Sequence, residues 1–167
     1  AAVKQKKSAS VHVKVDTGMG RIGVQPDEAL DFIVALKSLP ELSVEGVFTH
    51  FPSADEADRT FTTSQIAIFS KLIGALKRHG LALCAHASNS GGILAYPEAD
   101  FDAVRPGIMT YGNYPSNDVA RSISIREALT LKTSIVFIKE VDAGVTISYN
   151  RTHKLNRRSK VATLPIG

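Results

Sequence analysis

The sequence contains no tryptophan, two methionines and a single cysteine, Cys84, among its 167 residues. One cysteine excludes an internal disulfide framework and a cysteine-rich zinc site, and it is typical of a reducing compartment. No apolar run approaches the ~20 residues that a membrane-spanning helix needs, and the start, AAVKQKKSAS, lacks the apolar core of a secretory signal. These absences predict a cytoplasmic protein without membrane association.

Charge of one sign does not dominate either. The chain has 20 Lys and Arg against 16 Asp and Glu, and the net charge of +4 is spread along most of the sequence. Composition therefore permits nucleic-acid binding without indicating it, and we expect no nucleic-acid partner. With 44% hydrophobic and 22% charged residues, the chain has the composition of an ordinary globular domain.

An initiator methionine is also missing, and the final KVATLPIG is an apolar, strand-like run rather than a polar tail. The only tail-like segment is 1–10. We therefore expect the sequence to be a fragment of a longer protein.

Strand and helix patterns alternate along the first two-thirds of the chain. Apolar runs predict strands at 11–15, 44–49 and 83–87, with shorter ones at 103–104 and 108–111. Apolar residues at i, i+3, i+4 and i+7 spacing predict helices over 27–36 and 61–79, and Thr62 with Gln65 has capping-box spacing in the second. This alternation favours βα units and a parallel sheet, in either an open sheet or a barrel.

After about Ser122 the helical patterns stop, and strand-like runs with alternating polarity follow one another. This change predicts that a separate, mainly β domain begins here. The expected domains are therefore 1–121 and 122–167.

Polar clusters follow the predicted strands at their carboxyl ends, which is where open sheets and barrels both collect functional groups. The first cluster, DTGMGRIG at 16–23, has glycines after a strand, but no helix opens there as a dinucleotide fingerprint requires. One interpretation is a structural loop. The other is an anion site, since Arg21 held by glycine turns can bind an anionic oxygen bidentately.

Two later clusters have the composition of phosphate-binding loops. HASNSGG at 86–92 combines hydroxyls and an amide with two glycines, which leave backbone N–H groups accessible. An ordinary Ser/Asn helix cap explains the same residues. RPGI at 105–108 can present further backbone amides, and two such loops after late strands match the usual phosphate site of a (β/α)₈ barrel.

The five histidines offer no metal-ligand spacing, and no nucleophile elbow, Walker loop or pair of catalytic carboxylates is present. His50, at a strand end, is compatible with a core, surface or site position. We expect His12 and His79 to be structural or solvated, and we expect no metal site.

Five blocks in this order resemble the alanine racemase family. They are VHVKVDTGMGRIG (11–23), VEGVFTHFPSADE (44–56), CAHASNSGG (84–92), AVRPGIMTYG (103–112) and ISYNRT (147–152). The resemblance implies an α/β fold: strands five to eight of a (β/α)₈ TIM barrel with their helices, then the beginning of a mainly β C-terminal domain. It also implies pyridoxal 5′-phosphate (PLP) as cofactor and a head-to-tail homodimer.

The resemblance further assigns cofactor-binding roles. Ser90 and the backbone of Gly107 and Ile108 would bind the phosphate, with Asn89 beside them. Arg105 would face the pyridine nitrogen. His86 would also belong to this site, where it would hold Arg105 in position.

On the substrate side, the resemblance makes Tyr149 one of two catalytic bases, acting across the dimer interface with His50 in its hydrogen-bond network. Arg21 would reach the cofactor's phenolic oxygen and the substrate carboxylate. Lys14 would orient Arg21, and this lysine is carbamylated in many family members. Asn150 stands where the family usually has glycine, and asparagine tolerates positive φ better than most residues.

The implied activity of the parent protein is interconversion of L- and D-alanine, which supplies cell-wall peptidoglycan precursors. The lysine that binds PLP covalently lies in a segment resembling KADAYGHG, and no lysine here has that context. We therefore expect this chain alone to be inactive. Racemisation of serine or a broader range of amino acids, and a non-catalytic PLP-binding fragment, are the alternatives.

Overall fold

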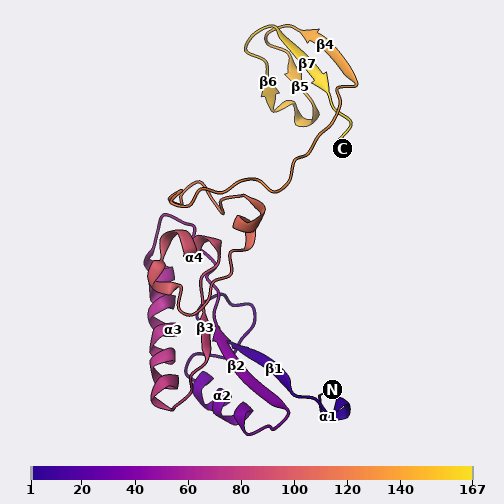
Figure 1. Ribbon diagram of the computed structural model, residues 1–167. Coiled ribbons are helices and arrows are strands. Elements are labelled where there is room, and N and C mark those ends of the chain that lie inside the picture. The colour runs from indigo at the N-terminus through magenta and orange to yellow at the C-terminus, as the bar shows by residue number, and fades with distance from the viewer. Residues whose placement is uncertain (1, 167) are drawn as a thin grey trace. The chain divides into compact units, whose positions relative to one another are not determined.

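The computed structural model describes residues 2–166, which form two compact units, one up to Ala128 and one from Leu129 (Figure 1). The first unit contains a three-stranded parallel sheet in the order β1-β2-β3, made of β1 (Ala9–Lys14), β2 (Leu42–Phe48) and β3 (Cys84–His86). The three main predicted strands are therefore confirmed as parallel neighbours. The domain boundary after residue 121 stays a prediction.

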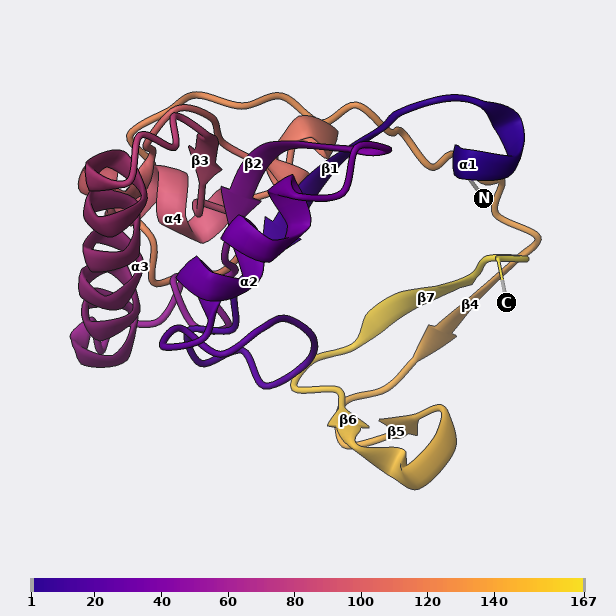
Figure 2. The same cartoon turned by 90° about the horizontal axis from the view of Figure 1, so that it is seen from below.

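Two helices connect these strands, as the apolar spacing predicted. They are α2 (Ala29–Lys37) and α3 (Thr60–Arg78), and both lie on one face of the sheet (Figure 2). Ile33 of α2 and Phe69 and Leu76 of α3 pack with Val15 and Val47 in the core, and each of these side chains is at most 1% exposed. Because alternate strand residues enter this core, their neighbours line the opposite, open face of the sheet.

The expected capping box in the second helix is wrong. The helix begins at Thr60, with Asp58 Oδ1 accepting a hydrogen bond from the Thr60 N–H at 2.9 Å. Thr62 and Gln65 lie within the helix and are completely buried. The spacing matched a cap, but these side chains face the core instead.

Three shorter predictions also need correction. Residues 108–111 belong to a 3₁₀ helix, η2 (Gly107–Tyr111), because the chain turns directly after Pro106, and they do not form a strand. The predicted strand at 103–104 is reduced to a single parallel bridge between Ala103 and His86. The expected tail contains a short helix, α1 (Ala2–Gln5), and the start of β1.

Within residues 2–166 the strands do not close a barrel, and the elements described after β3 in the first unit are short. These are α4 (Ser90–Ala95), η1 (Pro97–Ala99) and η2. The structure therefore confirms an α/β fold with a parallel sheet, and its barrel closure is not observed. Among residues 2–166, no helix is both long and apolar enough to cross a bilayer.

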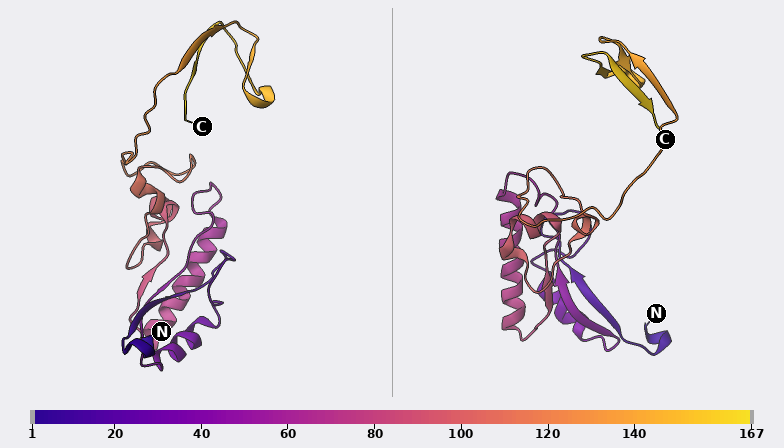
Figure 3. Two further views of the ribbon diagram at one scale, coloured as in Figure 1. Left: turned by 90° about the vertical axis from the view of Figure 1, so that its right-hand side faces the viewer. Right: turned by 45° about the horizontal axis from the view of Figure 1, so that its top comes forward.

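The second unit consists of short antiparallel pairs. β4 (Phe137–Val141) pairs with β7 (Ser159–Thr163), and β5 (Thr146–Ile147) pairs with β6 (His153–Lys154) (Figure 3). A 3₁₀ turn, η3 (Tyr149–Arg151), lies between β5 and β6. The strand-like run before β4 is irregular up to Val136, so that part of the predicted β pattern is not a strand.

Candidate functional site

A pocket of about 330 Å³ lies at the carboxyl edge of the parallel sheet. It is lined by residues from the loops after β2 and β3 and from the segment that begins at Arg105. The sequence-predicted residues that line it are His50, Asn89, Ser90, Arg105, Gly107 and Ile108. Asp55 also reaches this pocket, so its surroundings are not exclusively cationic.

Asn89 and Ser90 join the loop after β3 to its neighbours. Asn89 Oδ1 accepts from the Gly92 N–H at 3.0 Å and so caps α4, while its Nδ2 donates to the Phe51 carbonyl at 2.9 Å. Ser90 Oγ donates to the Pro106 carbonyl and accepts from the Met109 N–H. The cap interpretation of this motif is therefore correct, and the same residues also line the pocket.

Glycines bring these loops close together. A Cβ at Gly91 would lie 2.9 Å from the backbone of Ala54, and a Cβ at Gly107 would lie 3.5 Å from Ser90 Oγ. Gly107 also has a positive φ of 33°. A side chain at Gly91 would therefore clash with the neighbouring backbone, and at Gly107 the positive φ disfavours any residue but glycine.

Arg105 is the most extensively bonded side chain of the site. Its Nη2 donates to the carbonyls of Thr49 at 2.7 Å and Ala87 at 2.8 Å, and it lies 3.3 Å from His50 Nδ1. Its Nη1 is hydrogen-bonded to His86 Nδ1, and the guanidinium lies over the Phe48 ring. These contacts fix the plane and direction of the charge.

His86 lies between Arg105 and His12, and the sequence analysis had not placed His12 in the site. Its Nε2 is 2.8 Å from His12 Nδ1, and its ring stacks on Phe48 at 5.0 Å. Burial and the adjacent Arg105 charge lower the pKa of His86 to about 4, so its ring is neutral near pH 7. The sequence held one indication for His12, because it alternates with Lys14 and so shares one face of the strand with it. We nevertheless expected this histidine to be structural or solvated.

The loop after β1 is ordered by Asp16. Its Oδ1 accepts from the N–H groups of Gly18 and Gly20, each at 3.0 Å, and these bonds lower the pKa of the Asp16 carboxyl. Arg21 lies on this loop and is exposed. No nucleotide-type helix opens here, as the sequence predicted.

Positive charge is concentrated at this edge of the sheet. Burial lowers the pKa of Lys14, and the charges of Arg105 and Arg21 lower it further, against the opposing effect of Asp16. The pKa of His50 is lowered by burial and then by Arg105, Arg21 and Lys14. The first unit therefore offers a preformed setting for an anionic ligand.

Tyr149 lies in the second unit, where it is 93% exposed. The next residue, Asn150, has a φ of 56°, a conformation that glycine and asparagine adopt more readily than other residues. The expectation that asparagine would support this turn is therefore confirmed. The role expected for Tyr149 stays a prediction.

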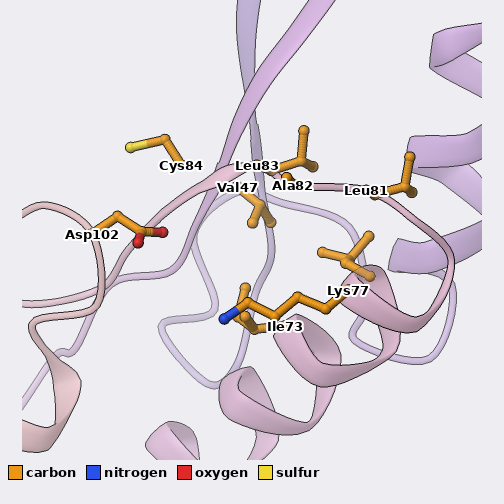
Figure 4. A pocket seen from close by; sticks show the side chains of 9 residues that line it. Val47, Ile73, Lys77, Leu81, Ala82, Leu83, Cys84 and Asp102 are labelled. Carbon is orange, nitrogen blue, oxygen red and sulfur yellow. The ribbon is translucent and has the colours of Figure 1, made fainter.

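A second pocket, of about 360 Å³, lies between β2, α3 and the chain leading into β3, and none of the expected site residues lines it (Figure 4). Val47, Ile73 and Leu83 contribute apolar walls, with Lys77 and Asp102 as polar members. Within residues 2–166, no cluster of three His, Cys, Asp or Glu residues is arranged to bind a metal.

The parallel βα sheet and the positive charge at its carboxyl edge define the class: an α/β protein whose candidate site lies where the strands end. Residues 1–115 match the family model described as alanine racemase, N-terminal domain, and residues 128–167 match alanine racemase, C-terminal domain. This chain belongs to the alanine racemase family.

Similar proteins support the same assignment. The chain is 46% identical over 169 residues to an alanine racemase of Clostridium perfringens and 46% over 167 residues to that of Halothermothrix orenii. Each match covers 99% of this chain and 44% of the relative. The chain therefore spans less than half the length of these curated relatives.

Solved structures agree with the sequence comparison. An alanine racemase structure from Clostridium difficile 630 matches with a TM-score of 0.80 and 39% identity, covering 99% of this chain and 44% of that one. The Bacillus anthracis alanine racemase with bound L-Ala-P matches with a TM-score of 0.69 and 35% identity, covering 94% and 42%. Both likenesses extend through most of the chain.

Proposed function

We propose that this chain is part of a PLP-dependent alanine racemase that interconverts L- and D-alanine. The observation that carries the proposal is the placement of Arg105 beside two glycine-containing loops, with hydrogen-bond partners that are all neutral. Membership of the alanine racemase family supports the same activity. The bound L-Ala-P of the Bacillus anthracis relative supports alanine as the substrate class.

The loops at Ser90 and Gly107 fit the phosphate of PLP. The first N–H groups of α4 have no partner within the helix, and Ser90, Gly91 and Gly107 all line the pocket. Ser90 Oγ and the backbone of Gly107 and Ile108 would hold the phosphate. Asn89 would act on this site by capping the helix rather than by carrying charge.

Arg105 fits the pyridine nitrogen of the cofactor. A guanidinium stays protonated at neutral pH, so it can donate a hydrogen bond to that nitrogen but cannot take a proton from elsewhere and deliver it there. When bound, PLP supplies an electron sink for the carbanion at the substrate Cα. Arg105 and His86 would keep that sink weak, which limits side reactions.

The substrate side would be formed by Arg21, Lys14 and His50, with Tyr149 as one proton-transfer group. Arg21 would hold the cofactor's phenolic oxygen and the substrate carboxylate, and Lys14 would orient it, carbamylated or not. Tyr149 Oη would remove or return the proton on one face of Cα, since inversion needs a group on each face. We propose that Tyr149 does so in a head-to-tail homodimer, in the cytoplasm, where the product supplies peptidoglycan precursors.

The test uses the full-length protein with added PLP, incubated separately with L-alanine and L-serine, and chiral chromatography of the products. We expect D-alanine to form faster than D-serine. Replacing Ser90 with Ala should weaken PLP binding about tenfold or more, the effect of one charge-assisted hydrogen bond, while Ser70→Ala on the exposed side of α3 should not. Faster racemisation of serine would support the serine alternative, and PLP binding without racemisation would support the non-catalytic one.

A further inference from the structure

Two imidazoles extend the Arg105 network across the open face of the sheet. Arg105 Nη1 contacts His86 Nδ1, and His86 Nε2 lies 2.8 Å from His12 Nδ1. The three residues come from β1, β3 and the segment after the Ala103 bridge. The chain of contacts therefore joins the arginine to the first strand of the sheet.

The chemistry of arginine determines the proton positions in this chain. Arg105 can only donate, so His86 Nδ1 must accept and its single proton lies on Nε2. That N–H then points at His12 Nδ1, which must also be an acceptor. A neutral His86 between a permanent donor and an imidazole acceptor has one tautomer that satisfies both neighbours: Nδ1 accepts from Arg105, and the Nε2–H donates to His12 Nδ1 at 2.8 Å.

Gly46 makes this arrangement possible. A Cβ at Gly46 would lie 2.3 Å from His12 Nδ1, closer than any side chain permits, so the imidazole occupies the place of a side chain on β2. The pairing of β1 with β2 shifts between Val11 and His12, which puts His12 opposite Gly46 rather than Glu45. The register shift and the missing side chain at Gly46 together determine where the His12 imidazole lies.

We propose that His12 is a positioning residue: its Nδ1 accepts the Nε2–H of His86 and so stabilises the tautomer in which His86 Nδ1 accepts from Arg105, which helps to hold the direction of the guanidinium. The inference rests on the proposed function, because it gives a catalytic purpose to the orientation of Arg105. Without the His12 acceptor, the Nε2–H of His86 loses its partner in the protein, and the tautomer with the proton on Nδ1 gains population against the preference that Arg105 imposes. Two donors then face each other, and Arg105 turns away from the Thr49 and Ala87 carbonyls that hold it.

The first test needs no substitution. In the full-length protein with labelled histidines, long-range ¹H–¹⁵N correlation near pH 7 reports which ring nitrogen of each histidine carries the proton. We expect His86 to be protonated on Nε2 and His12 to have an unprotonated Nδ1. A proton on His86 Nδ1, or on His12 Nδ1, would overturn the proposal.

The second test compares three variants of the same protein. His12→Phe keeps a ring but removes the acceptor, and His12→Asn restores an acceptor oxygen near the Nδ1 position. His79→Phe, at the exposed end of α3, is the matched control. We expect a mixture of His86 tautomers in His12→Phe alone, with kcat for alanine about fivefold lower, the equivalent of one neutral hydrogen bond, and KM unchanged. His12→Asn should recover most of the loss.

The outcomes separate the two proposals. An unchanged His86 tautomer in folded His12→Phe, with kcat unchanged, would refute the positioning role while leaving the racemase assignment intact. The expected tautomers in a wild-type protein that does not racemise amino acids would refute the proposed function while supporting the contact. If His12→Phe does not fold, the wild-type spectrum and His12→Asn still decide the matter.

Discussion

Arg105 is a cation whose acceptors are carbonyls and imidazoles. Within residues 2–166 the recorded ion pairs are those of Arg158 with Glu140 and Asp142, in the second unit. A carboxylate beside Arg105 would neutralise it and occupy its donors, whereas neutral acceptors preserve its charge for a ligand. The half-buried guanidinium of Arg105 therefore keeps its charge available for a ligand, and the groups around it determine its orientation.

His86 provides a pH prediction at this scale. Because burial and Arg105 lower its pKa to about 4, the folded protein resists protonation of a ring that the unfolded chain protonates near 6.5. The contribution of His86 to stability is therefore complete above pH 6.5 and is lost as the pH falls towards 4. We expect an NMR titration of His86 with a midpoint near 4. A midpoint near 6.5 would contradict the burial and contacts described.

Tyr149 provides a kinetic prediction. Tyr149→Phe in the full-length protein removes one proton-transfer group and leaves the cofactor contacts of the first unit untouched. General acid–base groups typically contribute 10² to 10⁴ in rate, so kcat should fall by about that factor. PLP absorbance should be retained. Arg21→Ala serves as a contrast, since losing a charge that positions substrate should also raise KM. Near-normal kcat in Tyr149→Phe would eliminate the tyrosine as a base.

Individual residues differ in how far sequence could place them. The positions of Ser90, Arg105 and His50 at one pocket follow from polar residues at the ends of successive parallel strands. His12 could not be placed in the same way, because its role depends on a register shift between two strands and on the absence of a side chain at Gly46. Gly46 and the alternation of His12 with Lys14 are visible in the sequence, but nothing there shows that the register shift puts His12 opposite that glycine.

Among the elements, α3 is the clearest success of the apolar pattern and also the source of an error. Ile66, Phe69 and Leu76 are buried as their spacing predicts. Thr62 and Gln65 are buried too, and Gln65 Nε2 donates to Thr17 Oγ1 at 3.2 Å, connecting the helix to the loop after β1. A local capping rule misassigned them because a tertiary contact determined their position.

The packing of α3 gives a stability prediction. Phe69 is completely buried and meets Phe101 edge to face at a centroid distance of 5.2 Å, whereas its neighbour Ile68 is 40% exposed. Phe69→Ala should destabilise the full-length protein by about 3–5 kcal/mol, since it removes transfer energy and leaves a cavity. Ile68→Ala, on the same turn, should cost about 1 kcal/mol or less. Urea unfolding of both variants checks this, and equal losses would mean that Phe69 is not in the core.

At the scale of the whole molecule, the sheet is open. β1 pairs only with β2 among the described residues, so its other edge is unpaired, and β4 presents Phe137 and Ile138 more than half exposed. The sequence predicted the parallel βα units and the β region that follows them. The length of each strand, however, depends on the neighbouring strands with which it can pair. Residues 103–104 illustrate this, because a single bridge is all that forms there.

This open edge predicts the behaviour of the 167-residue chain by itself. Unpaired strand edges and exposed apolar side chains favour association, so the chain should be prone to aggregate when expressed alone. It should also fail to convert L-alanine to D-alanine with added PLP, because none of its lysines has the context of the PLP-binding lysine. Size-exclusion chromatography and a chiral assay test the two statements. Conversion by the chain without a companion segment would contradict the second.

The last prediction concerns two copies of the full-length protein. If Tyr149 acts on the cofactor held by the partner, subunits with Tyr149→Phe and subunits lacking the PLP-binding lysine carry complementary defects. Each homodimer should be nearly inactive, but a mixed dimer should contain one site with both groups intact. Co-expression with two affinity tags isolates that mixed dimer, and its kcat per dimer should approach half of the wild-type value because one of two sites is complete. Activity no greater than that of the two homodimers would mean that both groups come from the same chain.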